Sequence, residues 1–155
     1  MIRVLFVCLG NICRSPMAEG IVRDLVKARG LQDAIHVDSA GTHAYHVGHA
    51  PDVRAQQTLA RRAIDIGGLK GRQVTPDDIA HFDYVLAMDE DNLLHLRAFP
   101  GGEGSHVRLF LDFAPPGSGY EVPDPYYGGA DGFEHVYGLL RGAAEGLLAD
   151  IEARL

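Results

Sequence analysis

The stretch Cys8-Leu9-Gly10-Asn11-Ile12-Cys13-Arg14-Ser15 follows an apolar run over residues 2–7 and leads into a helical pattern that opens at Ser15-Pro16. The run has the length of a buried strand, and proline is well tolerated at the first position of a helix. A strand that turns directly into a helix starts an α/β unit, and open α/β sheets bind ligands at the carboxyl ends of their strands. This stretch therefore decides the fold class and is the leading candidate site.

Three further apolar runs suit buried strands and alternate with helical patterns, which predicts a parallel sheet. The runs cover residues 36–40, 84–88 and 107–111. Helices are expected from Ser15 to just before Gly30, after Asp52 through Leu59 and Ala63, from Thr75 through Ile79, from Asp89 to Arg97, and from near Asp131 through Ile151. Right-handed crossovers would place these helices on both faces of the sheet. The prediction is an α/β three-layer sandwich with a four-stranded parallel sheet and a phosphate-binding loop after the first strand.

The 155 residues are expected to form a single domain, 1–155, because no repeat or linker divides them. A composition of 46% hydrophobic and 23% charged residues excludes collagen-like, coiled-coil and disordered classes. With 14 basic and 21 acidic residues the net charge is −7, which leaves no basic footprint for nucleic acid or for an anionic membrane. Met1 leads directly into the first expected strand, and no apolar run reaches the ~20 residues of a membrane span. We expect a cytoplasmic monomer.

The loop between the first strand and the first helix has the features of an anion site. Such a loop aims backbone N–H groups inward and adds the positive end of the helix dipole, which suits phosphate. The same field favours the nucleophilic thiolate form of Cys8. Arg14 can offer a planar fork to two phosphate oxygens, and Ser15 can offer a hydroxyl to the thiolate. The remaining loop residues expected around the anion are Leu9, Gly10, Asn11, Ile12 and Cys13.

A candidate proton donor lies far along the chain, in the irregular segment 114–130. Cleavage of a phosphate ester needs a proton for the leaving oxygen, and Val122-Pro123-Asp124-Pro125-Tyr126-Tyr127 supplies a carboxylate held between prolines. Taken alone, Asp124 would be interpreted as a turn residue and Cys8 as a small buried hydrophobe. Their combination with Arg14 indicates phosphoryl transfer instead.

Cys8 to Ser15 resembles the C-x5-R-S loop of the low molecular weight protein tyrosine phosphatases. Blocks at 38–42, 47–52, 71–75, 82–92 and 124–127 also resemble that family, in its order, over nearly the whole chain. The resemblance implies that Cys8 is the nucleophile, Arg14 binds the phosphate and transition state, and Asp124 is general acid and then base, without metal or cofactor. It implies phosphotyrosine proteins or small aryl phosphates as substrates and inorganic phosphate as product.

The resemblance assigns supporting roles as well. It implies that Asn11 braces the loop through Ser15 and Ser39, and that aromatic side chains line the cleft and sandwich the substrate ring. Those side chains are Tyr45, Tyr126 and Tyr127. It also implies that Cys8 and Cys13 form a reversible disulfide under peroxide. Many members carry a histidine where this chain has Leu69, so the support around Asn11 is expected to differ here.

Other functions remain open. A phosphocysteine carrier or signalling module would use the same kind of loop but would need no general acid. Arsenate reductase chemistry would need cysteines beyond Cys13, and the sequence has none. A redox or metal switch on the two cysteines would explain neither Arg14 nor Asp124. Zinc binding by His43, His46 and His49 lacks a carboxylate or cysteine partner, so we expect these loop histidines to be solvated.

Overall fold

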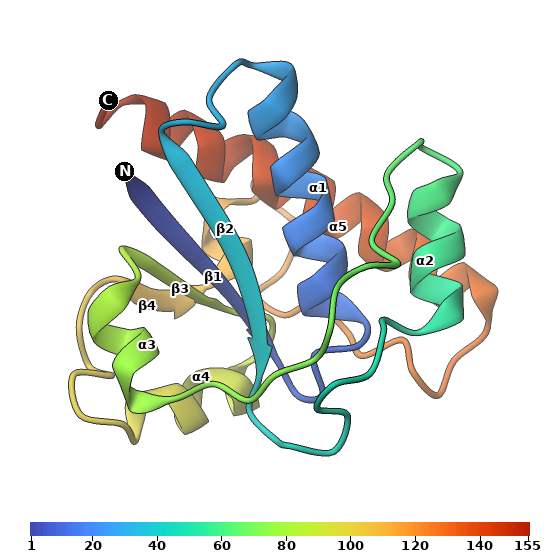
Figure 1. Cartoon of the computed structure of the whole chain (residues 1–155), viewed down its shortest axis with the longest axis horizontal. Coiled ribbons are helices and arrows are strands. Elements are labelled where there is room, and N and C mark those ends of the chain that lie inside the picture. Colours follow the sequence, from blue (N-terminus) through green and yellow to red (C-terminus); the bar gives the residue numbers. More distant parts are fainter.

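The computed structural model describes residues 1–155, apart from the side chain of Ala130. The strands β1 (Ile2–Cys8), β2 (Ile35–Gly41), β3 (Tyr84–Ala87) and β4 (Val107–Leu109) form one parallel sheet in the order β2-β1-β3-β4. The helices are α1 (Arg14–Ala28), α2 (Val53–Ala60), α3 (Pro76–His81), α4 (Glu90–Arg97) and α5 (Ala130–Glu152), and a 3-10 turn η1 (Phe110–Phe113) follows β4. Helices flank both faces of the sheet (Figure 1), which confirms the three-layer α/β sandwich.

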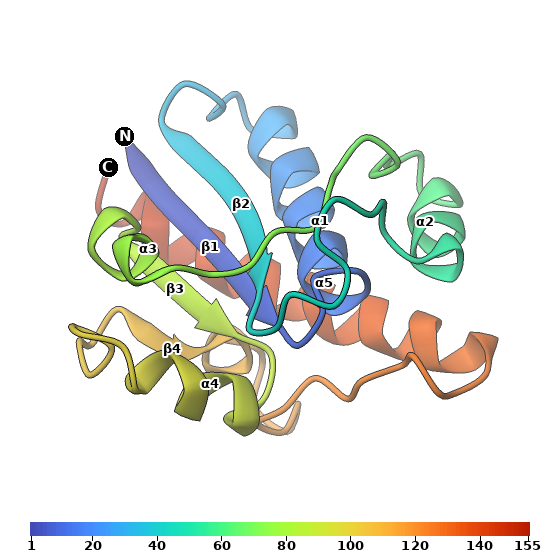
Figure 2. The ribbon, with the colours of Figure 1, turned by 60° about the horizontal axis from the view of Figure 1, so that its bottom comes forward.

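β1 lies inside the sheet and contributes to two hydrophobic cores, because side chains alternate across a strand. Val4 and Phe6 are fully buried on the face that α1 and α5 cover. Leu5 and Val7 are fully buried on the opposite face, under α3 and α4 (Figure 2). Phe6 also packs edge-on against Phe110, with 4.8 Å between ring centroids. Burial on both faces explains why this strand is a continuous apolar run in the sequence.

Two expected strands end earlier than predicted. The strand expected at 107–111 ends at Leu109, because Phe110 and Leu111 turn into η1. Both remain buried, so hydrophobicity alone did not distinguish a strand from a 3-10 turn in the core. The strand expected at 84–88 ends at Ala87, although Met88 is also fully buried.

The helix boundaries differ in a similar way. α2 ends at Ala60 and excludes Ala63, whose φ of 60° is incompatible with a continuing right-handed helix. α5 has Gly129 at its N-cap, whereas Asp131 was the predicted cap. Asp131 lies in the first turn instead, where its negative charge still interacts favourably with the helix dipole.

The strand order determines where a ligand can bind. β2 lies on one side of β1 while β3 and β4 lie on the other, so the chain reverses direction across the sheet next to β1. Open α/β sheets bind ligands beyond the carboxyl ends of the strands at such a switch point. The residue at the carboxyl end of β1 is Cys8. In the described part of the chain, none of the helices combines the length and the apolar character that crossing a membrane requires.

The packing of α5 on η1 gives a test of the fold. A Cβ added at Gly146 would lie 1.8 Å from the carbonyl oxygen of Phe113, whereas one added at Gly138 of the same helix meets nothing within 4 Å. We expect Gly146→Ala to lower the free energy of unfolding by about 1–3 kcal/mol through overpacking. Gly138→Ala should raise it by about 0.5–1 kcal/mol, since alanine favours a helix interior. Urea denaturation of both variants measures this; equal effects would contradict the close approach of α5 to η1.

Candidate active site

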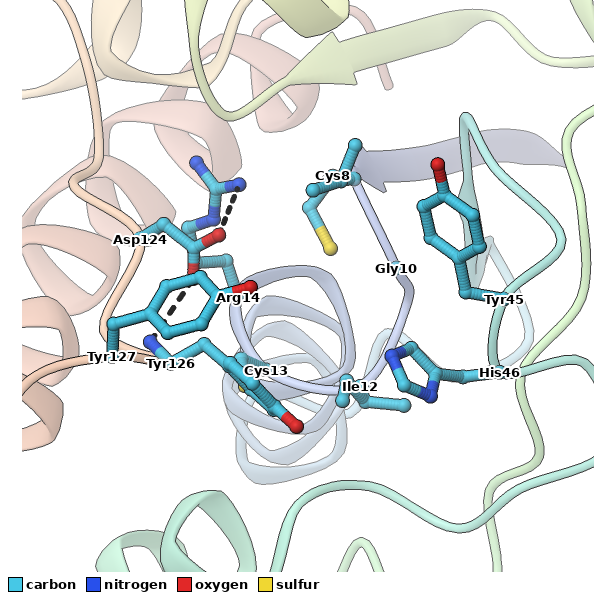
Figure 3. Close-up of a pocket in the computed structure, with 11 residues that line it drawn as sticks. Cys8, Gly10, Ile12, Cys13, Arg14, Tyr45, His46, Asp124, Tyr126 and Tyr127 are labelled. Atoms are coloured by element: carbon cyan, nitrogen blue, oxygen red, sulfur yellow. Dashed lines mark hydrogen bonds and ion pairs between the residues drawn. The ribbon is translucent and has the colours of Figure 1, made fainter.

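A pocket of about 320 Å³ opens at the carboxyl end of β1, a volume suited to a small ligand. Its lining combines the loop between β1 and α1 with two segments from elsewhere in the chain. The lining residues are Cys8, Leu9, Gly10, Ile12, Cys13 and Arg14 from the loop, Tyr45 and His46 after β2, and Asp124, Tyr126 and Tyr127 before α5. Figure 3 shows the loop curling along the pocket between Cys8 and Arg14. The three residues expected to carry the chemistry thus share one pocket.

The loop backbone forms a set of unpaired donors. Asn11 has a φ of 58°, and its N–H points at the sulfur of Cys8 at 3.3 Å. The backbone N–H groups that donate to no acceptor among the described residues are those of Leu9, Gly10, Ile12, Cys13, Arg14 and Ser15. The first turn of a helix leaves its N–H groups free, and buried donors normally have partners. The loop therefore has the donors that a bound anion requires.

The side chain of Asn11 connects the loop to its surroundings. Its Oδ1 accepts a hydrogen bond from the backbone N–H of Arg72 at 3.0 Å, which fixes the orientation of the amide. Its Nδ2 then donates to the hydroxyl of Ser15 at 2.9 Å and to that of Ser39 at 3.0 Å. The structure thus places both serines on Asn11, where the family resemblance puts them.

These bonds direct a hydroxyl hydrogen toward the sulfur of Cys8. Ser15 Oγ accepts from Asn11 and lies 2.9 Å from the sulfur of Cys8. Its alternative acceptor, the carbonyl of Ala40, is 3.5 Å away, so the sulfur is the better placed partner. Together with the N–H of Asn11, the hydroxyl gives the sulfur two donors.

Glu19 of α1 is a further member of this hydrogen-bond network. The sequence analysis did not identify it. The hydroxyl of Ser39 donates to its Oε1 at 2.6 Å, and Arg23 forms an ion pair with it. Burial raises the pKa of Glu19, while the hydrogen bond from Ser39 and the charge of Arg23 oppose that rise. Leu69, where the family resemblance led us to expect a difference, packs against the hydrophobic core. The support of Asn11 therefore comes from other groups.

Arg14 is 2% exposed, and hydrogen bonds and ion pairs fix its guanidinium group. Its Nη1 donates to Asp89 Oδ2 at 2.6 Å and to the carbonyl of Val122 at 3.0 Å, while its Nη2 lies 3.6 Å from Asp124 Oδ2 (Figure 3). Burial disfavours the charged form, but the negative charges of Cys8 and Asp89 outweigh it and raise the pKa of Arg14. Asp89 was missed as a site residue, although an acid after a strand adjacent to β1 is the signal that could have found it.

The tyrosines form two sides of the pocket mouth. Tyr45 and His46 lie on one side, and Tyr126 and Tyr127 lie on the other beside Asp124 (Figure 3). His43 stacks on Tyr45, with 5.1 Å between ring centroids, which gives that tyrosine a support. His46 is a further lining residue that the sequence analysis did not identify. Among the residues that the structure describes, no three histidine, cysteine or acidic side chains are grouped closely enough to hold a metal ion.

Cys13 lines the same pocket but differs chemically from Cys8. It caps α1 and is 4% exposed. Burial raises the pKa of its thiol, and the negative charges of Asp52 and Cys8 raise it further. These surroundings disfavour the thiolate form of Cys13.

The fold and the pocket define a class of α/β domain with a cysteine inside an anion-binding turn between strand and helix. The family model described as low molecular weight phosphotyrosine protein phosphatase matches residues 3–155. The low molecular weight protein-tyrosine-phosphatase YfkJ of Bacillus subtilis is 46% identical, over 98% of this chain and 97% of its own length. The chain belongs to the low molecular weight phosphotyrosine protein phosphatase family.

Solved structures agree with this assignment. The crystal structure of YfkJ from Bacillus subtilis superposes with a TM-score of 0.94 at 45% identity and covers 99% of this chain and 96% of that one. The crystal structure of a Drosophila arginine phosphatase superposes with a TM-score of 0.87 at 35% identity and covers 97% and 99%. The fold is thus shared by proteins with different named substrates.

Proposed function

We propose that this protein hydrolyses phosphotyrosine and small aryl phosphates through a phosphocysteine intermediate on Cys8. The observation that carries the proposal is the convergence of Cys8, Arg14 and Asp124 on one pocket beside unpaired backbone donors. A nucleophile, a cationic fork and a proton donor are the three groups that phosphomonoester cleavage requires. Family membership supports the same chemistry.

In the first step the thiolate of Cys8 attacks phosphorus, and the bond from phosphorus to the tyrosyl oxygen breaks. The loop N–H groups and Arg14 stabilise the equatorial oxygens, since Nη1 is held by Asp89 and leaves the remaining guanidinium hydrogens for the phosphoryl group. Protonated Asp124 donates its proton to the leaving oxygen. Its carboxyl lies at the pocket mouth, 3.6 Å from Arg14, where a leaving group would emerge.

In the second step the carboxylate of Asp124 accepts a proton from water, whose oxygen attacks the phosphorus of the phosphocysteine. The P–S bond breaks, inorganic phosphate leaves and the thiolate returns. Ser15 assists because its hydroxyl, 2.9 Å from the sulfur, donates to the departing thiolate. This acid-then-base role of Asp124 distinguishes a hydrolase from a phosphocysteine carrier, which would have no use for a proton donor at the pocket mouth.

The aromatic rim supports aryl phosphates as the substrate class. Tyr45 and Tyr126 line opposite sides of the pocket, so a phenyl ring above Cys8 can contact both. Contacts between aromatic rings contribute about 0.5–1.5 kcal/mol beyond area burial. Since an arginine phosphatase shares the fold, the fold alone does not determine the substrate, and we assign that choice to the rim. The absence of any cysteine after Cys13 in the sequence argues against arsenate reduction by a relay of disulfides.

Exchange of the nucleophile tests the proposed reaction directly. Wild type should release phosphate from phosphotyrosine peptide without added metal and leave phosphoserine and phosphoarginine peptides largely intact. We expect Cys8→Ser to abolish release while still binding phosphate or vanadate, because the loop donors and Arg14 remain. Phosphate release and vanadate titration measure the two effects. Substantial turnover by Cys8→Ser would remove Cys8 as nucleophile, and equal cleavage of the three peptides would remove the aryl specificity.

Exchange of the acid tests the proton transfer. We expect Asp124→Asn to lower kcat/KM by roughly 10²–10⁴-fold for substrates with poor leaving groups, the range typical of general acid catalysis. The loss should shrink as the leaving-group oxygen becomes more acidic, because such an oxygen departs without a proton. A series of substituted aryl phosphates measures this dependence. A loss that is the same for every leaving group would show that Asp124 is not the proton donor.

The second cysteine gives a redox prediction. Peroxide converts a thiolate at Cys8 to a sulfenic acid, which can condense with the thiol of Cys13 to a disulfide and water. Both sulfurs belong to one short loop on one pocket. We expect wild type to regain most activity when a thiol reductant follows peroxide, and Cys13→Ser to lose it irreversibly. Equal recovery in both proteins would assign Cys13 a packing role alone.

A further inference from the structure

Arg54 lies at the N-terminal turn of α2, where a positive charge opposes the helix dipole. Asp52, the N-cap residue, holds it there. Oδ1 of Asp52 accepts from the backbone N–H of Arg54 at 2.8 Å and from its Nε at 3.0 Å, and Oδ2 accepts from Nη2 at 3.0 Å. Because both carboxylate oxygens of Asp52 accept hydrogen bonds from it, the guanidinium plane is fixed, although the side chain of Arg54 is 39% exposed.

The other edge of this guanidinium contacts the segment that carries Asp124. Nη2 donates to the carbonyl of Tyr126 at 2.9 Å, and Nη1 donates to the carbonyl of Gly128 at 3.3 Å. The guanidinium also lies over the rings of Tyr126 and Phe133, at 5.6 and 4.8 Å from their centroids. Figure 1 shows this segment below α2 on its way into α5, and the two hydrogen bonds from Arg54 join them. Arg54 thus contacts Tyr126 and Gly128, which are exposed, and also packs over Phe133 of α5.

Tyr126 connects Arg54 to Asp124, the proposed proton donor. Its carbonyl accepts from Arg54, and its backbone N–H donates to Oδ1 of Asp124 at 3.1 Å. The same turn of chain also holds the phosphate-binding loop, because the backbone N–H of Asp52 donates to the carbonyl of Ile12 at 2.8 Å. The start of α2 therefore connects the loop of the nucleophile to the segment of the acid.

From these contacts, and on the basis of the proposed function, we infer that Arg54 is a positioning residue for leaving-group protonation. It holds the backbone at Tyr126 and Gly128 so that Asp124 stays over the pocket. Arg14 also contacts this segment, but in the proposed reaction its Nη2 is needed for the phosphoryl group. Arg54 does not line the pocket, so its contacts with the segment do not depend on bound substrate.

The test uses Arg54→Gln, Arg54→Lys and the control Arg62→Gln in the full chain. Arg62 follows α2 and also joins the α2 region to α5, through an ion pair with Glu134 and a contact over the ring of Tyr137. It makes no contact with residues 122–128 among those that the structure describes. kcat/KM is measured for aryl phosphates with good and poor leaving groups, and thermal unfolding is followed for each variant.

We expect Arg54→Gln to lower kcat/KM for poor leaving groups by roughly 10–100-fold, since misplacing a catalytic group by about 1 Å costs rate on that scale. Good leaving groups should lose much less, and Arg54→Lys should recover part of the loss. Arg62→Gln should leave the leaving-group dependence unchanged. Inhibition by inorganic phosphate should stay within about twofold of wild type, because a misplaced acid leaves the loop donors intact. Adding Arg54→Gln to Asp124→Asn should bring no further leaving-group sensitivity, as two changes that remove one interaction are not additive.

Several results would overturn the inference. An equal loss for all leaving groups, or the same loss in Arg62→Gln, would make Arg54 a general stabiliser of the fold. A parallel loss of phosphate inhibition would show that it acts through the nucleophile loop instead. Additive effects in the double variant would separate it from Asp124. A wild type without aryl phosphatase activity would contradict the proposed function itself. An active wild type whose kcat/KM is unchanged by Arg54→Gln would contradict only this inference.

Discussion

The left-handed backbone of Asn11 is the constraint on which the site depends. A φ of 58° turns the chain between β1 and α1 so that its N–H meets the sulfur of Cys8. Glycine could adopt this conformation equally well, but it could not supply the side-chain amide that joins Ser15, Ser39 and the backbone of Arg72. Asparagine combines both properties, because it tolerates the left-handed region and carries donors and an acceptor. One residue thus shapes the loop and fixes it to α1, to β2 and to the segment after α2.

The two halves of the site are held in different ways. Cys8 and Arg14 are nearly inaccessible and lie at the ends of core elements, so packing of the sheet and α1 determines their positions. Asp124 lies on a long segment and is 35% exposed in its side chain. That segment is anchored at Val122, which is fully buried and whose N–H donates to the carbonyl of Met88. Beyond that anchor the acid depends on hydrogen bonds rather than on burial. Packing therefore constrains the position of Asp124 less than the positions of Cys8 and Arg14.

Much of the fold was predictable, because burial on both faces makes parallel strands continuous apolar runs, and the strand–loop–helix turn at residues 8–15 marks the ligand edge. The grouping of Cys8, Arg14 and Asp124 in one pocket could also be inferred, since each residue type matches one requirement of phosphoryl transfer. Residues whose role depends on tertiary contacts could not be predicted in this way. Glu19 has the spacing of a surface ion pair with Arg23, yet it is 3% exposed and supports Ser39. Leu109 to Leu111 form an unbroken apolar run, and only the packing against α5 turns its end into η1.

The charges around Arg14 link substrate binding to the protonation of the acid. Nη1 is neutralised by Asp89 at 2.6 Å, while Nη2 lies 3.6 Å from Asp124. An ionised Asp124 would compete with a phosphoryl oxygen for Nη2 and would also repel the phosphate, since opposite and like charges at such distances act strongly in a buried pocket. A protonated Asp124 removes both effects and is the form that can donate a proton to the leaving oxygen. Once that proton is transferred, the new carboxylate is repelled by the phosphocysteine oxygens and attracts a proton from water. In the proposed reaction, Asp124 therefore acts as the acid in the first step and as the base in the second, beside the same guanidinium.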